Sequence, residues 1–214
     1  MKGLIIKDLK LTARTTTRAM LIVYGLLIIY MGYVSKEGAG LIISVLLGMV
    51  IGMSVLTTMT LDEGTGWFKQ ERLLPLSLKE KVGAKYLLLI ALLLPASLLL
   101  VPLAALIPLI FPAARFADIG LMLAALWCLT LIYNAVSIPV TYRFGSKSRV
   151  ITMLLIIFPS TSLMGGMQGG SIPAMLARQA LPAPLLMILL VLLAIALYAA
   201  SFPLSCRMYR RYID

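Results

Sequence analysis

The sequence has no histidine, and it has only two cysteines and eight carboxylates among 214 residues. A serine–histidine nucleophile is excluded because its general base is missing. A metal site would lack both imidazole ligands and clustered thiols, the usual ligands of zinc. Cys128 and Cys206 lie in or at the edge of apolar runs. We interpret them as packing residues rather than a disulfide pair.

The phosphate-binding motif Gly-x-x-x-x-Gly-Lys-Ser/Thr is also absent, so the chain is not expected to bind ATP in that way by itself. All carboxylates lie outside the long apolar runs or at their ends. A proton-coupled transporter usually keeps ionisable groups within the membrane, and none is expected here. The adjacent Asp62 and Glu63 are the one candidate for the metal ligands of a lipid-modifying enzyme, and two neighbouring residues form a poor site. Energy for uphill transport must therefore come from another subunit.

Long apolar runs dominate the rest of the chain. Hydrophobic residues make up 61% of it and charged residues 13%, whereas a soluble domain carries about a quarter charged residues. A helix needs about 20 residues to cross the hydrocarbon core. These runs predict an all-α integral membrane protein with a single transmembrane domain over 1–214. The six predicted spans are 19–35, 41–61, 85–111, 116–142, 150–167 and 183–205.

The distribution of basic residues predicts the orientation of the spans. Sixteen of the 19 lysines and arginines lie in the N-terminal segment, the second and fourth connections, or the C-terminal tail. Basic loops beside spans stay in the cytoplasm, so both termini of this multi-pass protein are expected there. The net charge of +11 is spread between apolar runs rather than gathered on one polar face. Nucleic acid is therefore not an expected partner.

The N-terminal segment 1–18 is too charged to span a membrane. Lys7, Lys10 and Arg14 fall on one stripe of a helical wheel, with Ile5 and Leu9 roughly opposite. This pattern predicts an interfacial helix along the inner leaflet, with its basic stripe near lipid phosphates. The alternative is an ordinary positive flank of the first span with no role beyond topology.

The segment 62–84 is the only sizeable polar stretch in the interior of the sequence. Asp62 and Glu63 are interpreted as a hinge at the end of the second span. The residues 67–74 can form about two helical turns with mixed apolar and charged faces, ended by Pro75. Ser77 and Glu80 form a capping box, which predicts that a new helix begins at residue 78 and continues into the third span.

The same segment carries apolar side chains that a solvated linker would not need. They are Trp67, Phe68, Leu73 and Leu74. We therefore expect the protein to meet a partner here.

Small residues and prolines mark two of the spans. Gly48 and Gly52 form a Gly-x-x-x-Gly motif, which lets helix backbones approach closely. This motif places the second span inside the bundle or at a dimer seam. The third span carries Pro95, Pro102 and Pro108. Each proline removes a backbone hydrogen bond, so this helix is expected to be kinked or broken.

Polar side chains within the spans are candidates for lining a pathway. Tyr133, Asn134 and Ser137 share a face of the fourth span, and Thr57 belongs to a run of hydroxyl residues in the second. An amide in the membrane needs a partner, so this face should point to the bundle interior or to a polar pathway. A structural hydrogen bond between helices is an equally good explanation.

Short motifs around the second span resemble those of a known family. They are Lys7-Asp8, Asp62-Glu63 with Trp67, Leu74-Pro75-Leu76-Ser77, and Lys85-Tyr86. They are similar to the motifs of the small ABC-2-type permease subunits of bacterial ATP-binding-cassette exporters, although the basic residue after the serine is displaced by one, to Lys79. About 35 residues carry this motif-like identity, while the span count covers the whole chain.

The resemblance implies a permease of the bacterial cytoplasmic membrane, paired with a second permease chain, the same or related. Two separate ATPase subunits would bind ATP and magnesium, and this chain would need no cofactor and perform no catalysis. In this family the segment after the second span contacts the ATPase. The implied coupling residues are Trp67, Phe68, Glu71, Arg72, Leu73, Leu74 and Pro75.

The substrate is not identified by the sequence. Some relatives export amphipathic or antimicrobial peptides, and a pathway lined by hydroxyl and amide groups suits a peptide or a lipid-like molecule better than an ion. A non-transporting membrane scaffold or regulatory protein is the main alternative, and a lipid-modifying enzyme is a further one. A scaffold would have no ATPase partner.

Overall fold

The computed structural model describes residues 2–15, 22–23, 25–26, 30, 39–110, 119–148, 150–151 and 183–213. Within these ranges the regular structure is entirely helical. The elements in chain order are α1 Lys2–Thr15, α3 Ala39–Gly64, α4 Trp67–Arg72, α5 Leu78–Ile110, α6 Ile119–Phe144, η2 Gly145–Lys147 and α9 Ala183–Ile213.

Four helices of this described part are long and apolar enough to cross a membrane. They are α3, α5, α6 and α9, and they correspond to the predicted spans 41–61, 85–111, 116–142 and 183–205. The helix α9 extends eight residues beyond the predicted end of the last span. The predicted spans 19–35 and 150–167 lie outside the described residues except at a few positions.

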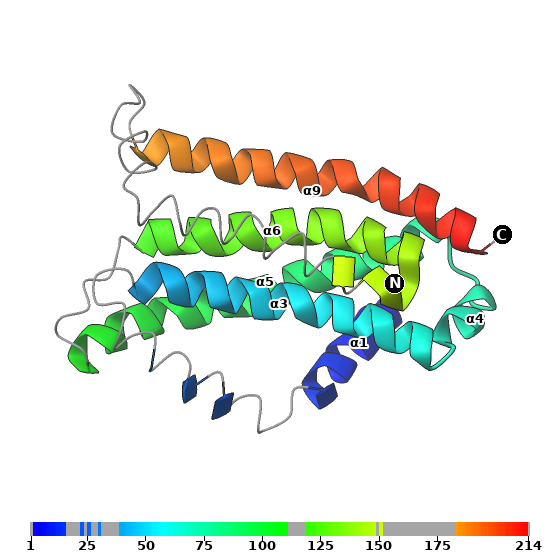
Figure 1. Ribbon diagram of the computed structural model, residues 1–214, viewed down its shortest axis with the longest axis horizontal. Helices are drawn as coiled ribbons and strands as arrows, with labels where there is room; N and C mark the ends of the chain where they lie inside the picture. Colours follow the sequence, from blue (N-terminus) through cyan, green and yellow to red (C-terminus); the bar gives the residue numbers. More distant parts are fainter. Residues whose placement is uncertain are drawn as a thin grey trace.

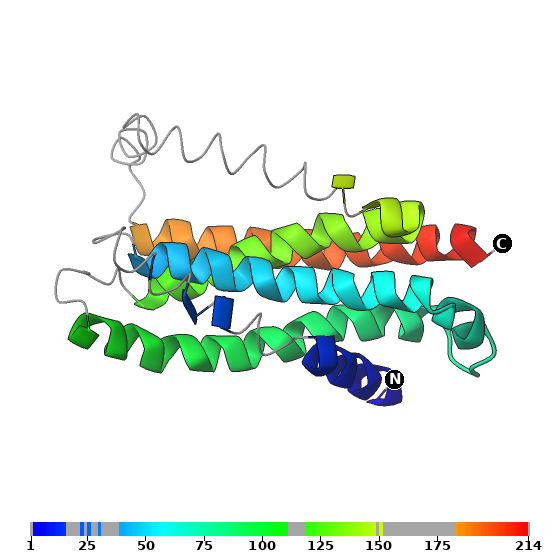
Figure 2. The ribbon, with the colours of Figure 1, turned by 60° about the horizontal axis from the view of Figure 1, so that its bottom comes forward.

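The four long helices lie side by side (Figures 1 and 2). The helix α6 packs against α9 on one side and α3 on the other, and α5 contacts all three. The buried core between them is built from large apolar side chains, including Met59, Leu88, Leu126 and Ile138. The outer faces of α5 and α9 remain apolar and exposed, for example at Leu98, as expected for helices surrounded by lipid.

The small-residue motif of α3 packs inside the chain. A Cβ atom at Gly48 would lie 2.6 Å from the Thr130 hydroxyl of α6. At Gly52 it would collide with the Tyr133 ring, and it would lie 2.9 Å from the Asn134 amide nitrogen. Only glycine lets α3 and α6 approach this closely. Of the two expected places for this motif, the structure therefore selects the bundle interior.

The helix α5 begins where the capping box predicts. The Ser77 hydroxyl accepts a hydrogen bond from the Glu80 backbone N–H at 3.3 Å, and the Ser77 N–H donates to the Glu80 carboxylate at 2.9 Å. Of the kink or break expected at the prolines, the break does not occur, because α5 continues as one helix through Pro95, Pro102 and Pro108. Pro95 and Pro102 lie on its exposed side, where each ring costs one backbone bond without disturbing a packed neighbour.

The close contact at Gly52 predicts a specific effect of adding one methyl group. Gly52→Ala should lower the free energy of unfolding by about 1–3 kcal/mol, because the added atom overfills the contact between α3 and α6. Gly64→Ala, in the same helix, is the control, since no heavy atom lies within 4 Å of its Cβ position. Thermal unfolding in detergent measures both. Equal melting temperatures for the two variants would contradict the packing.

Candidate functional site

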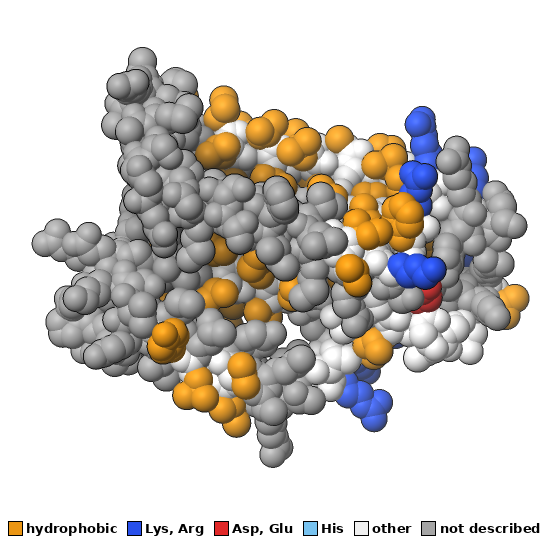
Figure 3. Space-filling view, in the orientation of Figure 1, with side chains coloured by type: hydrophobic (Ala, Val, Ile, Leu, Met, Phe, Trp, Pro, Cys, Tyr) orange, Lys and Arg blue, Asp and Glu red, His pale blue; other side chains and the backbone are white. Residues whose placement is uncertain are grey.

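Three parts of the chain that are distant in sequence gather at one end of the bundle, which we name the charged end. They are α1, the α4 segment and the C-terminal end of α9 (Figures 1 and 2). Hydrophobic side chains cover the length of the bundle, whereas lysine and arginine side chains gather toward this end (Figure 3). The charged end is therefore where polar chemistry is concentrated.

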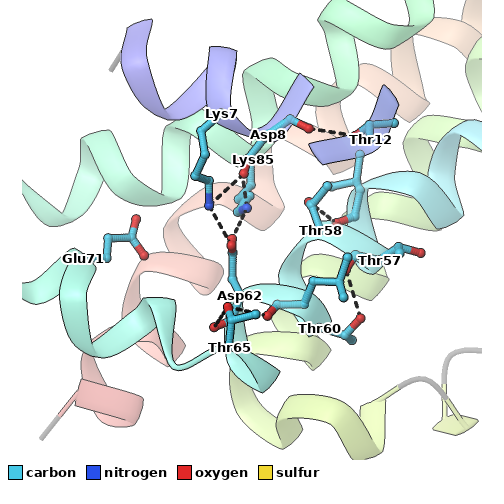
Figure 4. Close-up of polar contacts among 12 residues, drawn as sticks. Lys7, Asp8, Thr12, Thr57, Thr58, Thr60, Asp62, Thr65, Glu71 and Lys85 are labelled. Atoms are coloured by element: carbon cyan, nitrogen blue, oxygen red, sulfur yellow. Dashed lines mark hydrogen bonds and ion pairs between the residues drawn. The ribbon is translucent and has the colours of Figure 1, made fainter. Parts of the chain in front are cut away.

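Four charged side chains form a cluster at the charged end (Figure 4). The Lys85 ammonium lies 2.7 Å from the Asp8 carboxylate and 2.7 Å from the Asp62 carboxylate. The Lys7 ammonium lies 2.6 Å from Asp62 and 3.0 Å from Asp8. We name this group the four-charge cluster. It joins α1, the last turn of α3 and the second turn of α5.

The four-charge cluster is buried and balanced. The side chains of Asp8, Asp62 and Lys85 are 1%, 5% and 5% exposed, and that of Lys7 is 27% exposed. Removing an ion from water costs several kcal/mol unless a partner of opposite charge compensates. Two lysines face two aspartates here, so the formal charge of the cluster is zero. Each member depends on the others for this compensation.

The structure corrects the interpretation of Asp62 and Glu63 as a hinge. The helix α3 continues to Gly64, and Asp62 points from its last turn into the four-charge cluster. The Glu63 carboxylate instead packs against Gly145, directly after α6. The turn lies later, at Gly66, whose φ of 70° is a left-handed conformation that glycine adopts without strain.

The predicted basic stripe of α1 is also divided. Lys10 and Arg14 are exposed, as an interfacial helix requires. Lys7 does not belong with them, because it turns inward to pair with Asp62. Its ammonium also lies 4.5 Å from the centroid of the Trp67 ring, which places a cation over an aromatic face. Lys7 thus connects α1 directly to α4. Residues 16–18 of the predicted interfacial helix lie outside the described part.

The buried Glu71 connects α4 to two other helices. Its backbone carbonyl accepts a hydrogen bond from Lys81 of α5 at 2.6 Å. Its carboxylate accepts one from the Tyr209 hydroxyl of α9 at 3.3 Å. Desolvation by burial raises the pKa of the Glu71 carboxyl, and the negative charge of Asp62 adds to this effect against the opposing lysines. The short helix is therefore held by the bundle.

Beyond α4 the chain turns its apolar side chains outward. Leu73 is 86% exposed, and Leu74 and Pro75 are exposed as well. We name Leu73, Leu74 and Pro75 the apolar tip. The predicted coupling residues therefore separate into two groups, since Trp67 and Glu71 face the protein while the apolar tip faces away. The side chains of Phe68 and Arg72 are not among those described.

The candidate pathway residues lie within helix contacts. Asn134 and Ser137 are fully buried, and Tyr133 packs against Gly52. The Asn134 amide donates to the Thr130 carbonyl one turn earlier in α6, at 2.9 Å. The Thr57 hydroxyl donates to the Met53 carbonyl of its own helix at 2.8 Å. These bonds satisfy the Asn134 amide nitrogen and the Thr57 hydroxyl, whereas the buried Asn134 Oδ1 has no hydrogen-bond partner among the described residues. A role in lining a pathway stays a prediction.

Several residues of the charged end were not identified by sequence reasoning as site residues. Asp8 and Lys85 appeared in the family-like motifs without a structural role, Asp62 was interpreted as part of a hinge, and Tyr209 was not singled out. Tyr86, beside Lys85, shares hydrogen bonds with the hydroxyls of Ser201 and Ser205 at 2.6 and 2.8 Å, which connect α5 to α9. The sequence signal that could have identified the charged residues was their position, since isolated charges of both signs lie at the ends of the apolar runs.

The fold and the charged end define a helical membrane protein. At one end it exposes the apolar tip, which follows a short helix held by the bundle. The family comparison is more specific. The chain matches the family described as "ABC-2 family transporter protein" over residues 3–210, and it belongs to that family. It is thus a membrane-embedded permease subunit of an ABC transporter, a component that is generally not catalytic itself, and the family implies association with an ABC ATPase. No curated protein and no solved structure matches it.

The balance of the four-charge cluster can be tested by removing one charge and then restoring neutrality. Lys85→Met should lower the free energy of unfolding by about 3–5 kcal/mol, because two buried carboxylates then share one lysine. Lys85→Met combined with Asp8→Asn should be more stable than Lys85→Met alone, since the charges balance again. Thermal unfolding of the purified protein in detergent measures these differences.

The control for this series is Lys79→Met, which removes an exposed lysine from the same helix. It should leave the melting temperature nearly unchanged. A loss for Lys85→Met no greater than that for Lys79→Met would show that the four-charge cluster does not stabilise the fold.

Proposed function

We propose that this chain is the permease of an ATP-driven exporter and that the apolar tip contacts a separate ATPase subunit. The observation that carries the proposal is the contrast at α4, where Leu73 is 86% exposed while Glu71, two residues earlier, is 5% exposed. Leu73 can contact a partner subunit, while Glu71 is held by the bundle. Movement of the partner can therefore be passed from one to the other. ATP and magnesium belong to the ATPase in this arrangement.

The contacts of α4 supply a path for that movement. Displacement of the apolar tip acts on Glu71, which bonds to α5 through Lys81 and to α9 through Tyr209. It also acts on Trp67, which lies beneath Lys7 of α1. Three helices would therefore respond together to a movement of one short segment.

The orientation follows from the charge at this end of the bundle. The described end of α9, α1 and α4 lie together there, with exposed lysines and arginines around them (Figure 3). Basic segments stay on the cytoplasmic side of spans. We place the charged end, both termini and the ATPase contact in the cytoplasm.

The assembly in this proposal has two permease chains of six spans each, together with two ATPase subunits. The substrate is an amphipathic peptide or a lipid-like molecule that meets Thr57, Tyr133, Asn134 and Ser137 when α3 and α6 separate. Support for this class comes from the spans themselves, because away from the charged end their described polar side chains are mainly hydroxyls and one amide, with no acid or base among them. Such groups suit a substrate with mixed polar and apolar surfaces.

The apolar tip predicts a mutation that affects ATPase association and leaves the fold intact. Leu73→Ala should weaken association with the ATPase by about tenfold or more, because burying a leucine contributes about 1.5–3 kcal/mol. ATP hydrolysis stimulated by the permease should fall with it. Association is measured with purified subunits in nanodiscs, and hydrolysis by phosphate release.

The matched control is Leu98→Ala, which shortens a leucine that is 75% exposed on the side of α5. It should retain wild-type association and hydrolysis. If Leu73→Ala and Leu98→Ala behaved alike, the apolar tip would not be the ATPase contact. Absence of any ATPase association with the wild-type chain would instead favour a scaffold.

A further inference from the structure

We propose that the outer face of α1 binds anionic phospholipid headgroups and that this binding is transmitted to α4 through Lys7. Any effect of this lipid binding on ATP hydrolysis rests on the proposed function. The lipid contact and the response of α4 do not depend on it. The inference thus adds a regulatory input, the anionic lipid content of the membrane, to the coupling segment.

The helix α1 has two different faces. Its inner face carries Leu4 and Asp8, which are buried against the bundle. Its outer face carries Lys2, Ile6, Lys10 and Arg14, which recur every four residues and are exposed. Residues with this spacing share one side of a helix. Asp8 is the one acidic residue of α1 and points inward. All charged side chains of the outer face are therefore basic, and Ile6 is the large apolar side chain among them.

The rest of the charged end supports an anionic partner. Within the described ranges, the charged residues that are exposed are all lysines or arginines, whereas Asp8, Asp62 and Glu71 are buried and the Glu80 carboxylate, although near the surface, accepts hydrogen bonds from Ser77. The exposed residues are Lys2, Lys10, Arg14, Lys79, Arg143, Lys147, Arg207 and Arg210. Exposed basic charge of this kind attracts the phosphate groups of anionic lipids beside a membrane, and the part of it that we assign to the lipid contact is the outer face of α1.

The choice of a lipid follows from the position of α1 and from Ile6. The helix lies alongside the ends of spanning helices that carry apolar, exposed faces (Figure 2). The Ile6 side chain, 51% exposed between Lys2 and Lys10, suits the boundary between headgroups and acyl chains. A purely soluble anion would gain nothing from this isoleucine.

Lys7 is the connection between the outer face and α4. It lies on the same rigid helix as Lys10 and Arg14. Its ammonium pairs with Asp62 at 2.6 Å and lies 4.5 Å from the centroid of the Trp67 ring. A shift of α1 toward the membrane therefore changes the position of a cation over the Trp67 ring. The four-charge cluster confines this movement, because Asp8 of the same helix is paired with Lys85.

Trp67 fluorescence tests the connection without an ATPase. The chain has two tryptophans, so Trp127→Phe makes Trp67 the sole emitter. The full-length protein is placed in nanodiscs of phosphatidylcholine with increasing phosphatidylglycerol. Emission from Trp67 should shift with the anionic fraction. The double variant Lys10→Gln and Arg14→Gln should lose most of this shift, while the control Arg143→Gln and Lys147→Gln retains it.

A second measurement does not require the Trp127→Phe substitution, so it remains valid if that variant fails to fold. Spin-labelled phosphatidylglycerol reports lipid contact in the otherwise wild-type chain, and the Lys10/Arg14 variant should bind less of it than the Arg143/Lys147 control. Lys7→Gln should keep the lipid contact and lose the Trp67 response. Equal lipid contact for the Lys10/Arg14 variant and its control would overturn the lipid site. A retained response in Lys7→Gln would overturn the role of Lys7.

ATP hydrolysis by the complete transporter distinguishes this inference from the proposed function. If both hold, hydrolysis changes with the phosphatidylglycerol fraction in the wild type and not in the Lys10/Arg14 variant. A Trp67 response with no ATPase coupling under any lipid condition would contradict the proposed function and support the lipid site. ATPase coupling with no lipid response at Trp67 would support the proposed function and contradict the lipid inference.

Discussion

The structure of the charged end depends on compensating the buried positive charge of Lys85. Lys85 lies about 10 Å along α5 from the start of that helix, at 1.5 Å per residue, and its side chain is 5% exposed. A cation in such a place must be compensated. The two carboxylates that compensate it come from α1 and α3, so the need to neutralise one lysine brings three helices together. Lys7 completes the balance and adds the contact with Trp67.

This arrangement explains how a short helix between two spans can be held firmly and still present an exposed surface. The helix α4 has only six residues, too few to be stable in isolation. Its inward side chains contact structures that the bundle already fixes, namely Lys7 at Trp67 and Tyr209 at Glu71. Leu73 and its neighbours are left free to contact a partner. Membership of the ABC-2 transporter family makes an ATPase the natural partner.

Local features of this protein could be predicted from its sequence, and the four-charge cluster could not. The capping box at Ser77 depends on residues three apart, so the start of α5 was correctly predicted. The pairing of Asp8 with Lys85 joins residues separated by 77 positions, and no local pattern specifies it. The rotation of α1 that turns Lys7 inward follows from that pairing. The hinge interpretation of Asp62 failed because α3 gains a buried partner for this residue and so continues past it.

An experimental structure of the complete transporter in a lipid nanodisc is the most direct test of this account. We expect the Lys85 ammonium to lie within hydrogen-bond distance of both Asp8 and Asp62, with Lys7 over the Trp67 ring. The apolar tip should be buried against the ATPase in the same structure. A structure in which α1 lies apart from α5, with Lys85 facing water or another partner, would contradict the central role of the four-charge cluster.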